Sequence, residues 1–156
     1  MFAGSEHIFP TQGHGLELAC GAGRSSVWLA SRGLTVLGVD RDPGSITHAR
    51  RTAAAYGVAD RCRFELHDLD LGLPADEPAD VIICHLFRDP SLDHQILDRL
   101  KPGGLLAIAT LSEVGFGPGR FRAKPGELSQ CFSQLHPILS GEGSGRAWLA
   151  GYKPHS

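Results

Sequence analysis

Short apolar runs alternate along this chain with stretches that have the periodicity of helices. This alternation constrains the fold more than any other feature, because parallel strands need a helix to carry the chain back between them. We therefore predict an α/β protein with a doubly wound, mostly parallel sheet. The predicted strands are 16–20, 35–39, 63–66, 80–84 and 105–111. The predicted helices are 25–32, 43–56, 90–100 and 127–132.

Two of the predicted helices begin with the same pair of residues. Asp42 precedes Pro43, and Asp89 precedes Pro90. An aspartate caps the free N–H groups of a first turn, and proline at the first helical position loses no hydrogen bond. Gly57 ends the first of these helices.

The last part of the chain departs from the alternation. Two short runs, 135–139 and 147–152, flank the turn sequence SGEGSGR without a helix between them. Such a pair forms an antiparallel hairpin, which we place at one edge of the sheet. In sheets of this class, ligands bind at the carboxyl ends of the strands, where the strand order reverses.

A glycine-rich turn follows the first predicted strand, in the sequence LELACGAGR. Gly21 and Gly23 allow the backbone to approach a ligand, and the following helix presents free N–H groups. Asp40 ends the second strand, where a carboxylate can accept hydrogen bonds from both hydroxyls of a ribose. Nicotinamide dinucleotides and S-adenosylmethionine both fit these features.

Two further features separate these cofactors. Glu17 lies four residues before Gly21, where its charge would repel a pyrophosphate but would suit the ammonium group of S-adenosylmethionine. The sequence HDLD follows the third strand, and it positions Asp68 for an adenine amino group and the N–H of Leu69 for the ring. We therefore favour S-adenosylmethionine as the cofactor.

Composition limits the other possibilities. The 156 residues fit one domain, here 15–156, with 1–14 as a loose lead-in. The net charge of −2 gives no general attraction to nucleic acid or to a membrane surface. The four cysteines and eight histidines show no metal-binding spacing, so we predict no metal. With neither a signal peptide nor an apolar run long enough for a membrane span, we expect a cytoplasmic protein.

Four motifs together resemble a known family. LELACGAGR, VLGVD, FELHDLD and LKPGGLL occur in the order and spacing of the class I S-adenosylmethionine-dependent methyltransferases. The resemblance spans roughly residues 15–154 and implies a Rossmann-like seven-stranded sheet with an antiparallel last strand. FRDPSL and FRAKPGEL are similar to the tellurite-resistance-like or thiopurine-like branch, whose members act on small molecules.

The resemblance also implies the cofactor-binding residues. Those in the first half of the site are Glu17, Ala19, Cys20, Gly21 and Gly23, and the others are Asp40, Arg41, Asp68, Leu69 and His85. Ala19 stands where the family commonly has glycine. Arg41 stands where an apolar residue often stacks on adenine, and its guanidinium plane can stack instead.

Three residues are candidates for the chemistry. His85 directly follows the fourth strand and could take a proton from the acceptor or only hydrogen-bond the cofactor. Arg88 could bind an anionic acceptor or pair with an acid, and Glu113 follows the fifth strand. The position after the fourth strand reads CHLFRDP, which argues against a DNA base methyltransferase.

We predict a methyltransferase that acts on a small molecule. A catalytically silent S-adenosylmethionine-binding subunit is the alternative, because only fourteen residues precede the first strand and family members usually carry one or two helices there. A nicotinamide-dependent oxidoreductase fits Glu17 and the later motifs poorly. A homodimer could supply the missing cover over the cofactor.

Overall fold

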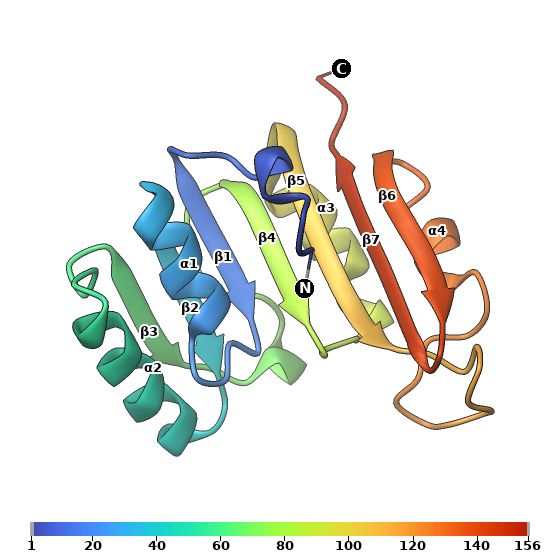
Figure 1. The fold of residues 1–156 in the computed structure, drawn as a ribbon, viewed down its shortest axis with the longest axis horizontal. Coiled ribbons are helices and arrows are strands. Elements are labelled where there is room, and N and C mark those ends of the chain that lie inside the picture. Colours follow the sequence, from blue (N-terminus) through green and yellow to red (C-terminus); the bar gives the residue numbers. More distant parts are fainter. Residues whose placement is uncertain (1, 156) are drawn as a thin grey trace.

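The computed structural model describes residues 2–155 and contains one seven-stranded sheet (Figure 1). The strands are β1 (His14–Leu18), β2 (Thr35–Asp40), β3 (Cys62–Leu66), β4 (Ala79–His85), β5 (Leu100–Leu111), β6 (His136–Gly143) and β7 (Arg146–Tyr152). The α-helices are α1 (Arg24–Arg32), α2 (Pro43–Ala55), α3 (Asp93–Arg99) and α4 (Glu127–Cys131). Three 3₁₀ turns are η1 (Glu6–Ile8), η2 (Leu69–Leu71) and η3 (Pro90–Leu92).

The strand order is β3-β2-β1-β4-β5-β7-β6. The pairs from β3 through β5 are parallel, whereas β7 is antiparallel to both β5 and β6. The prediction of a doubly wound, mostly parallel sheet with an antiparallel C-terminal hairpin is confirmed. The order reverses between β1 and β4, so a ligand crevice is expected at the carboxyl ends of these two strands.

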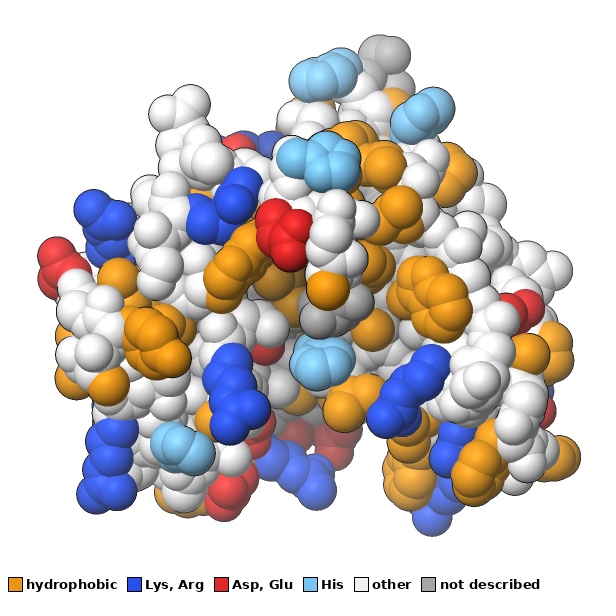
Figure 2. All heavy atoms as spheres, in the orientation of Figure 1, with side chains coloured by type: hydrophobic (Ala, Val, Ile, Leu, Met, Phe, Trp, Pro, Cys, Tyr) orange, Lys and Arg blue, Asp and Glu red, His pale blue; other side chains and the backbone are white. Residues whose placement is uncertain are grey.

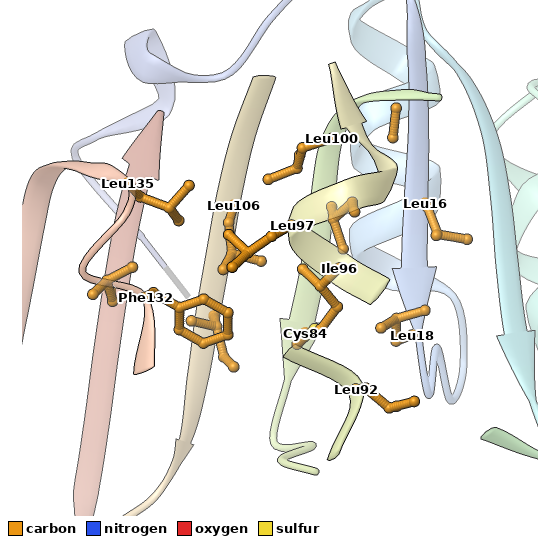
Figure 3. Packing of buried hydrophobic residues seen from close by; sticks show 14 of the residues in the cluster. Leu16, Leu18, Cys84, Leu92, Ile96, Leu97, Leu100, Leu106, Phe132 and Leu135 are labelled. Carbon is orange, nitrogen blue, oxygen red and sulfur yellow. The ribbon is translucent and has the colours of Figure 1, made fainter. Parts of the chain in front are cut away.

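Helices cover the two faces of the sheet. Helices α1 and α2 lie over one face, and α3 and α4 lie over the other (Figure 1). Figure 3 shows Leu106 of β5 beside Leu97 of α3, and Leu16 of β1 belongs to the same buried cluster. Alternate residues of β4 enter opposite clusters, which confirms the prediction that this strand is buried on both faces. No helix within residues 2–155 is both long and apolar enough to cross a membrane.

The two predicted caps are present. The Asp42 carboxylate accepts a hydrogen bond from the N–H of Ser45 at 3.1 Å, and α2 begins at Pro43. The Asp89 carboxylate accepts from the N–H of Ser91 at 3.0 Å. The second cap starts the 3₁₀ turn η3 rather than an α-helix, and α3 follows only from Asp93. The predicted helix over 90–100 is therefore two elements.

The first strand ends earlier than the sequence predicts. It ends at Leu18, because Ala19 has a φ of 55° and turns the chain out of the sheet. The N–H of Cys20 still donates to the carbonyl of Val39 at 2.8 Å, which ties the turn to β2. The glycine-rich turn is thus held above the carboxyl ends of β1 and β2.

The segment before β1 is packed in the structure, whereas the sequence predicts a loose lead-in. Ile8 and Phe9 are buried in the cluster on the α1 face. The ring of Phe9 meets that of Trp28 edge-on at 5.1 Å, and the Tyr152 hydroxyl donates to the Ile8 carbonyl at 2.7 Å. This short segment therefore joins α1 to the last strand.

Candidate functional site

A pocket of about 560 Å³ opens at the carboxyl edge of the sheet. Figure 2 shows a notch in the surface at this edge, with acidic side chains recessed inside it. Seven of the lining residues lie at or just after the ends of β1, β2 and β3, which are neighbours in the sheet. They are Ala19, Asp40, Arg41, His67, Asp68, Leu69 and Asp70.

Two backbone N–H groups hold the Asp40 carboxylate in place. Oδ2 accepts from the N–H of Gly21 at 2.9 Å, and Oδ1 accepts from the N–H of Asp42 at 2.9 Å. Each carboxylate oxygen retains a second acceptor position. The orientation is therefore set before a ligand arrives, and the side chain can still accept from two hydroxyl groups.

The two glycines of the turn have different roles. A Cβ on Gly21 would meet no atom within 4 Å, so this residue leaves open space beside the pocket. A Cβ on Gly23 would lie 2.8 Å from the Ala49 Cβ and 3.0 Å from the Phe64 ring. Gly23 therefore allows α1 to pack closely against α2 and β3, and it also precedes the first residue of α1.

Glu17 is buried beneath the turn rather than in the pocket. Its Oε1 accepts from the Ser26 N–H at 3.1 Å and from the Ser26 hydroxyl at 2.7 Å. Burial raises the pKa of Glu17 to about 7. The carboxyl group thus fastens β1 to the first turn of α1, and the residues lining the pocket do not include it.

The turn after β3 forms the far wall of the pocket. The Asp68 carboxylate accepts from the Asp70 N–H at 2.9 Å, which fixes the 3₁₀ turn around the buried Leu69. His67 is held by a 2.8 Å hydrogen bond between its Nε2 and the Gly72 carbonyl. Arg41, directly after β2, also lines the pocket, and its side chain is exposed.

The charges of the pocket are mostly negative. Four carboxylates line it, from Asp40, Asp68, Asp70 and Asp89. Arg41 contributes one exposed guanidinium. Such a site suits a ligand with a positive centre and disfavours a pyrophosphate.

Arg88 lines the same pocket but is held by two acids. Its Nη1 and Nη2 donate to the two oxygens of Asp93 at 2.6 and 3.0 Å, and its Nε donates to Glu127 at 2.7 Å. These carboxylates raise the pKa of the guanidinium further above its ordinary value. The sequence leaves two roles open for Arg88, binding an anionic acceptor or pairing with an acid. In the structure Arg88 pairs with two acids.

The other two catalytic candidates lie outside this pocket. His85 is the last residue of β4, and its side chain lines a second pocket on the α1 face of the sheet. Glu113 lies in the loop after β5, where its carbonyl accepts from the N–H groups of Phe116 and Gly117. Neither pocket includes Glu113 among its described lining residues. The sequence therefore groups three residues that the structure places apart.

The cysteine in the turn has no reactive thiol. Burial raises the pKa of Cys20 to about 12, so the thiol stays protonated at neutral pH. Its contribution to the site is the backbone hydrogen bond to β2 described above. Within residues 2–155, no three His, Cys, Asp or Glu side chains are grouped so that they could hold a metal ion.

The sequence does not indicate the apolar residues that line the pocket directly after β4. Leu86 directly follows β4 with a φ of 59°, and its side chain is exposed toward the pocket. Phe87, Pro90, Leu111 and the exposed Phe121 are further apolar residues that line the pocket. Left-handed backbone at a leucine is rare, but no sequence pattern marks it, because only the sheet and its loops impose that conformation.

A mostly parallel sheet with this strand order, a glycine turn after β1 and an aspartate at the end of β2 is typical of Rossmann-like proteins that bind a nucleoside cofactor. The comparisons with known proteins identify the family more narrowly. The family model described as a methyltransferase domain matches residues 16–104. The chain therefore belongs to the class I S-adenosylmethionine-dependent methyltransferases, as the sequence predicts, and S-adenosylmethionine is the cofactor of this family.

Individual relatives agree with this assignment. The ribosomal protein L11 methyltransferase of Aliivibrio salmonicida is 33% identical over 60% of this chain and 32% of its own length. In its fold, the chain is similar to TehB from Haemophilus influenzae, which superposes with a TM-score of 0.78 at 21% identity over 90% of this chain and 57% of its own. A DhpI–S-adenosylhomocysteine complex superposes with a TM-score of 0.67 at 23% identity over 92% of this chain and 78% of its own. The chain thus spans about a third of the L11 methyltransferase and just over half of TehB.

Proposed function

We propose that this protein transfers a methyl group from S-adenosylmethionine to a small-molecule acceptor. The acidic pocket at the carboxyl edge carries the proposal. Asp40 has two free acceptor positions for the ribose, and Asp68 and Leu69, which line the same pocket, are the residues that we expect to contact the adenine. Four carboxylates around the pocket favour a cofactor with a positive sulfur.

The residues around the site fit the chemistry of methyl transfer. When bound, S-adenosylmethionine supplies a methyl group activated by its positive sulfur, which keeps the electron pair of the broken carbon–sulfur bond. A hydroxyl or thiol acceptor releases one proton as its lone pair forms the new bond, so the protein must take up that proton. Burial lowers the pKa of His85, which leaves its imidazole neutral at pH 7 and able to accept it.

Two other functions remain to be separated from this one. The name of the L11 methyltransferase indicates a protein acceptor. In this chain, however, the pocket lined by Asp40 and the pocket lined by His85 have the volumes of small-molecule sites. The exposure of Leu86 and Phe121 at the pocket favours the alternative, a silent cofactor-binding subunit, because exposed apolar side chains can be covered by a partner protein. A cytoplasmic location and a homodimer stay predictions from the sequence.

Cofactor binding can be tested directly by calorimetric titration with S-adenosylhomocysteine. We expect it to bind, and we expect NAD not to bind. The Asp40→Ala substitution removes the acceptor for two ribose hydroxyls, each contributing about 1.5–3 kcal/mol to a charged partner. Affinity should therefore fall at least about tenfold.

Asp42→Ala is the matched control for this experiment. It removes a neighbouring carboxylate that caps α2 and does not line the pocket, while the backbone N–H that holds Asp40 remains. We expect this variant to lose some stability but to bind S-adenosylhomocysteine as the wild type does. Equal affinity of Asp40→Ala and the wild type would exclude the ribose role, and binding of NAD alone would exclude the methyltransferase.

A further inference from the structure

A second pocket, of about 290 Å³, lies on the other side of the end of β4. Its walls come from the N-terminal segment, the start of α1 and the α1 face of β4. His85 lines this pocket and the next residue, Leu86, lines the first pocket, so both pockets reach the end of the same strand. A volume near 300 Å³ is at the small end of ligand sites.

Three aromatic rings form the wall of this second pocket. Phe9 and Trp28 meet edge-on at 5.1 Å, and Phe2 lies against Phe9 at 6.2 Å between ring centres. The Arg32 guanidinium stacks 4.8 Å from the Trp28 ring and also donates to the Phe9 carbonyl at 2.9 Å. Trp28 is therefore held in position without a ligand, and its half-buried ring borders the pocket.

The polar groups of this pocket are basic. Arg24 lines it from the first turn of α1, is exposed, and forms no ion pair with the residues that the structure describes. Burial and, to a smaller extent, the positive charge of Arg146 on β7 lower the pKa of His85. No described carboxylate lines this pocket, whereas four line the cofactor pocket. The two neighbouring sites thus favour ligands of opposite charge.

We propose that this second pocket binds the methyl acceptor and that the acceptor is a planar aromatic molecule with a negatively charged substituent and an ionisable hydroxyl or thiol. The inference rests on the proposed function and specifies its acceptor. The aromatic wall receives the ring, Arg24 pairs with the charged substituent, and His85 faces the hydroxyl or thiol beside the cofactor pocket. His85 takes the acceptor's proton on its free ring nitrogen and returns it to solvent.

Fluorescence of Trp28 can report binding. The chain has two tryptophans, so Trp148→Phe leaves Trp28 as the single emitter. In this background, saturated with S-adenosylhomocysteine, we would titrate 4-hydroxybenzoate as the probe. Cyclohexanecarboxylate has the same charge without an aromatic face, and 4-hydroxybenzamide has the ring without the charge. We expect 4-hydroxybenzoate to change the Trp28 emission at the lowest concentration of the three.

Two arginine variants test the contact between Arg24 and the charged substituent of the acceptor. Arg24→Ala should weaken 4-hydroxybenzoate binding about tenfold and leave 4-hydroxybenzamide unchanged, because only the first has a carboxylate to lose. Arg51→Ala removes the same charge from an exposed position of α2 that does not line the pocket, and it should change neither. Equal effects of the two variants would overturn the role of Arg24.

The outcomes separate this inference from the proposed function. If S-adenosylhomocysteine binds but 4-hydroxybenzoate leaves the Trp28 emission unchanged, the acceptor site is overturned and the cofactor site stands. Binding of cyclohexanecarboxylate as tight as that of 4-hydroxybenzoate would overturn the aromatic acceptor. If S-adenosylhomocysteine itself does not bind, the proposed function fails, and the acceptor site fails with it.

Discussion

Ala19 turns the chain out of β1 in a conformation that suits glycine. Its φ of 55° lies in the left-handed region, where the Cβ of an L-residue approaches the following carbonyl oxygen and costs about 1–2 kcal/mol. Leu86 takes a similar conformation, with a φ of 59°. Ala19 and Leu86 both line the pocket at the carboxyl edge, whereas Ser144, the other described non-glycine residue with a positive φ, lies in the turn between β6 and β7. Two of these three strained positions are therefore at the site.

Replacing Ala19 with glycine should stabilise the protein. The relief of strain is offset by the greater freedom of glycine in the unfolded chain, about 0.4–1 kcal/mol, so we expect a net gain of about 0.5–1 kcal/mol. Ala22→Gly is the control, because Ala22 lies in the same turn but does not have a positive φ. Denaturant unfolding should show a gain for the first variant and a loss for the second; a loss for both would contradict the strain.

Between elements, the ion pairs of Arg88 join the segment after β4 to α4. The guanidinium is almost fully buried, and Asp93 and Glu127 come from different helices. The Arg88 guanidinium also lies 5.4 Å from the centre of the Phe132 ring. This cluster holds one wall of the cofactor pocket in place, so we assign Arg88 a positioning role and not a catalytic one.

Removal of Glu127 tests that cluster. Glu127→Ala leaves the buried Nε of Arg88 without its acceptor, which should cost about 2–3 kcal/mol of unfolding free energy. Glu142→Ala removes an exposed carboxylate that accepts from the N–H of Gly126 beside the same helix, and it should cost less than about 1 kcal/mol. Urea unfolding measures both; equal losses would show that the buried pair is not what anchors α4.

For the whole molecule, Glu17 makes stability depend on pH. Its pKa is about 7 in the folded protein, against an ordinary value of 4.5, because burial disfavours the charged form. At a pH between these two pKa values, Glu17 is protonated in the folded protein but has released its proton in the unfolded chain. The contribution of Glu17 to the unfolding free energy therefore falls as the pH rises from about 4.5 to about 7, by about 3 kcal/mol.

Glu17→Gln removes this titration and keeps an acceptor for Ser26. The difference in unfolding free energy, variant minus wild type, should therefore become more positive by up to about 3 kcal/mol between pH 4.5 and pH 8. Glu65→Gln changes a half-exposed carboxylate of β3 and should show no comparable change. A difference that stays constant over this pH range would show that Glu17 ionises in the folded protein as it does in water.

The sequence by itself determined the fold class and the family, and it indicated the edge of the sheet at which the pocket lined by Asp40 and Asp68 lies. These features depend on neighbouring residues: alternation of apolar runs with helices, a cap before a proline, and glycine and aspartate at strand ends. The rule that parallel strands end at the same edge then brings Asp40 and Asp68 together without knowledge of any side-chain contact. These predictions succeed because they depend on local patterns and a general rule of topology.

Only the tertiary structure decided which contact each site residue makes. Arg88 meets an acid 39 positions away, and no pattern in the sequence indicates which of the two predicted roles it takes. His85 faces the α1 side of the sheet because side chains alternate along β4, and the crossovers decide which helix covers which face. The aromatic wall beside it depends on a segment without periodicity, in which Phe9 is buried only because Trp28 and β7 are there to cover it.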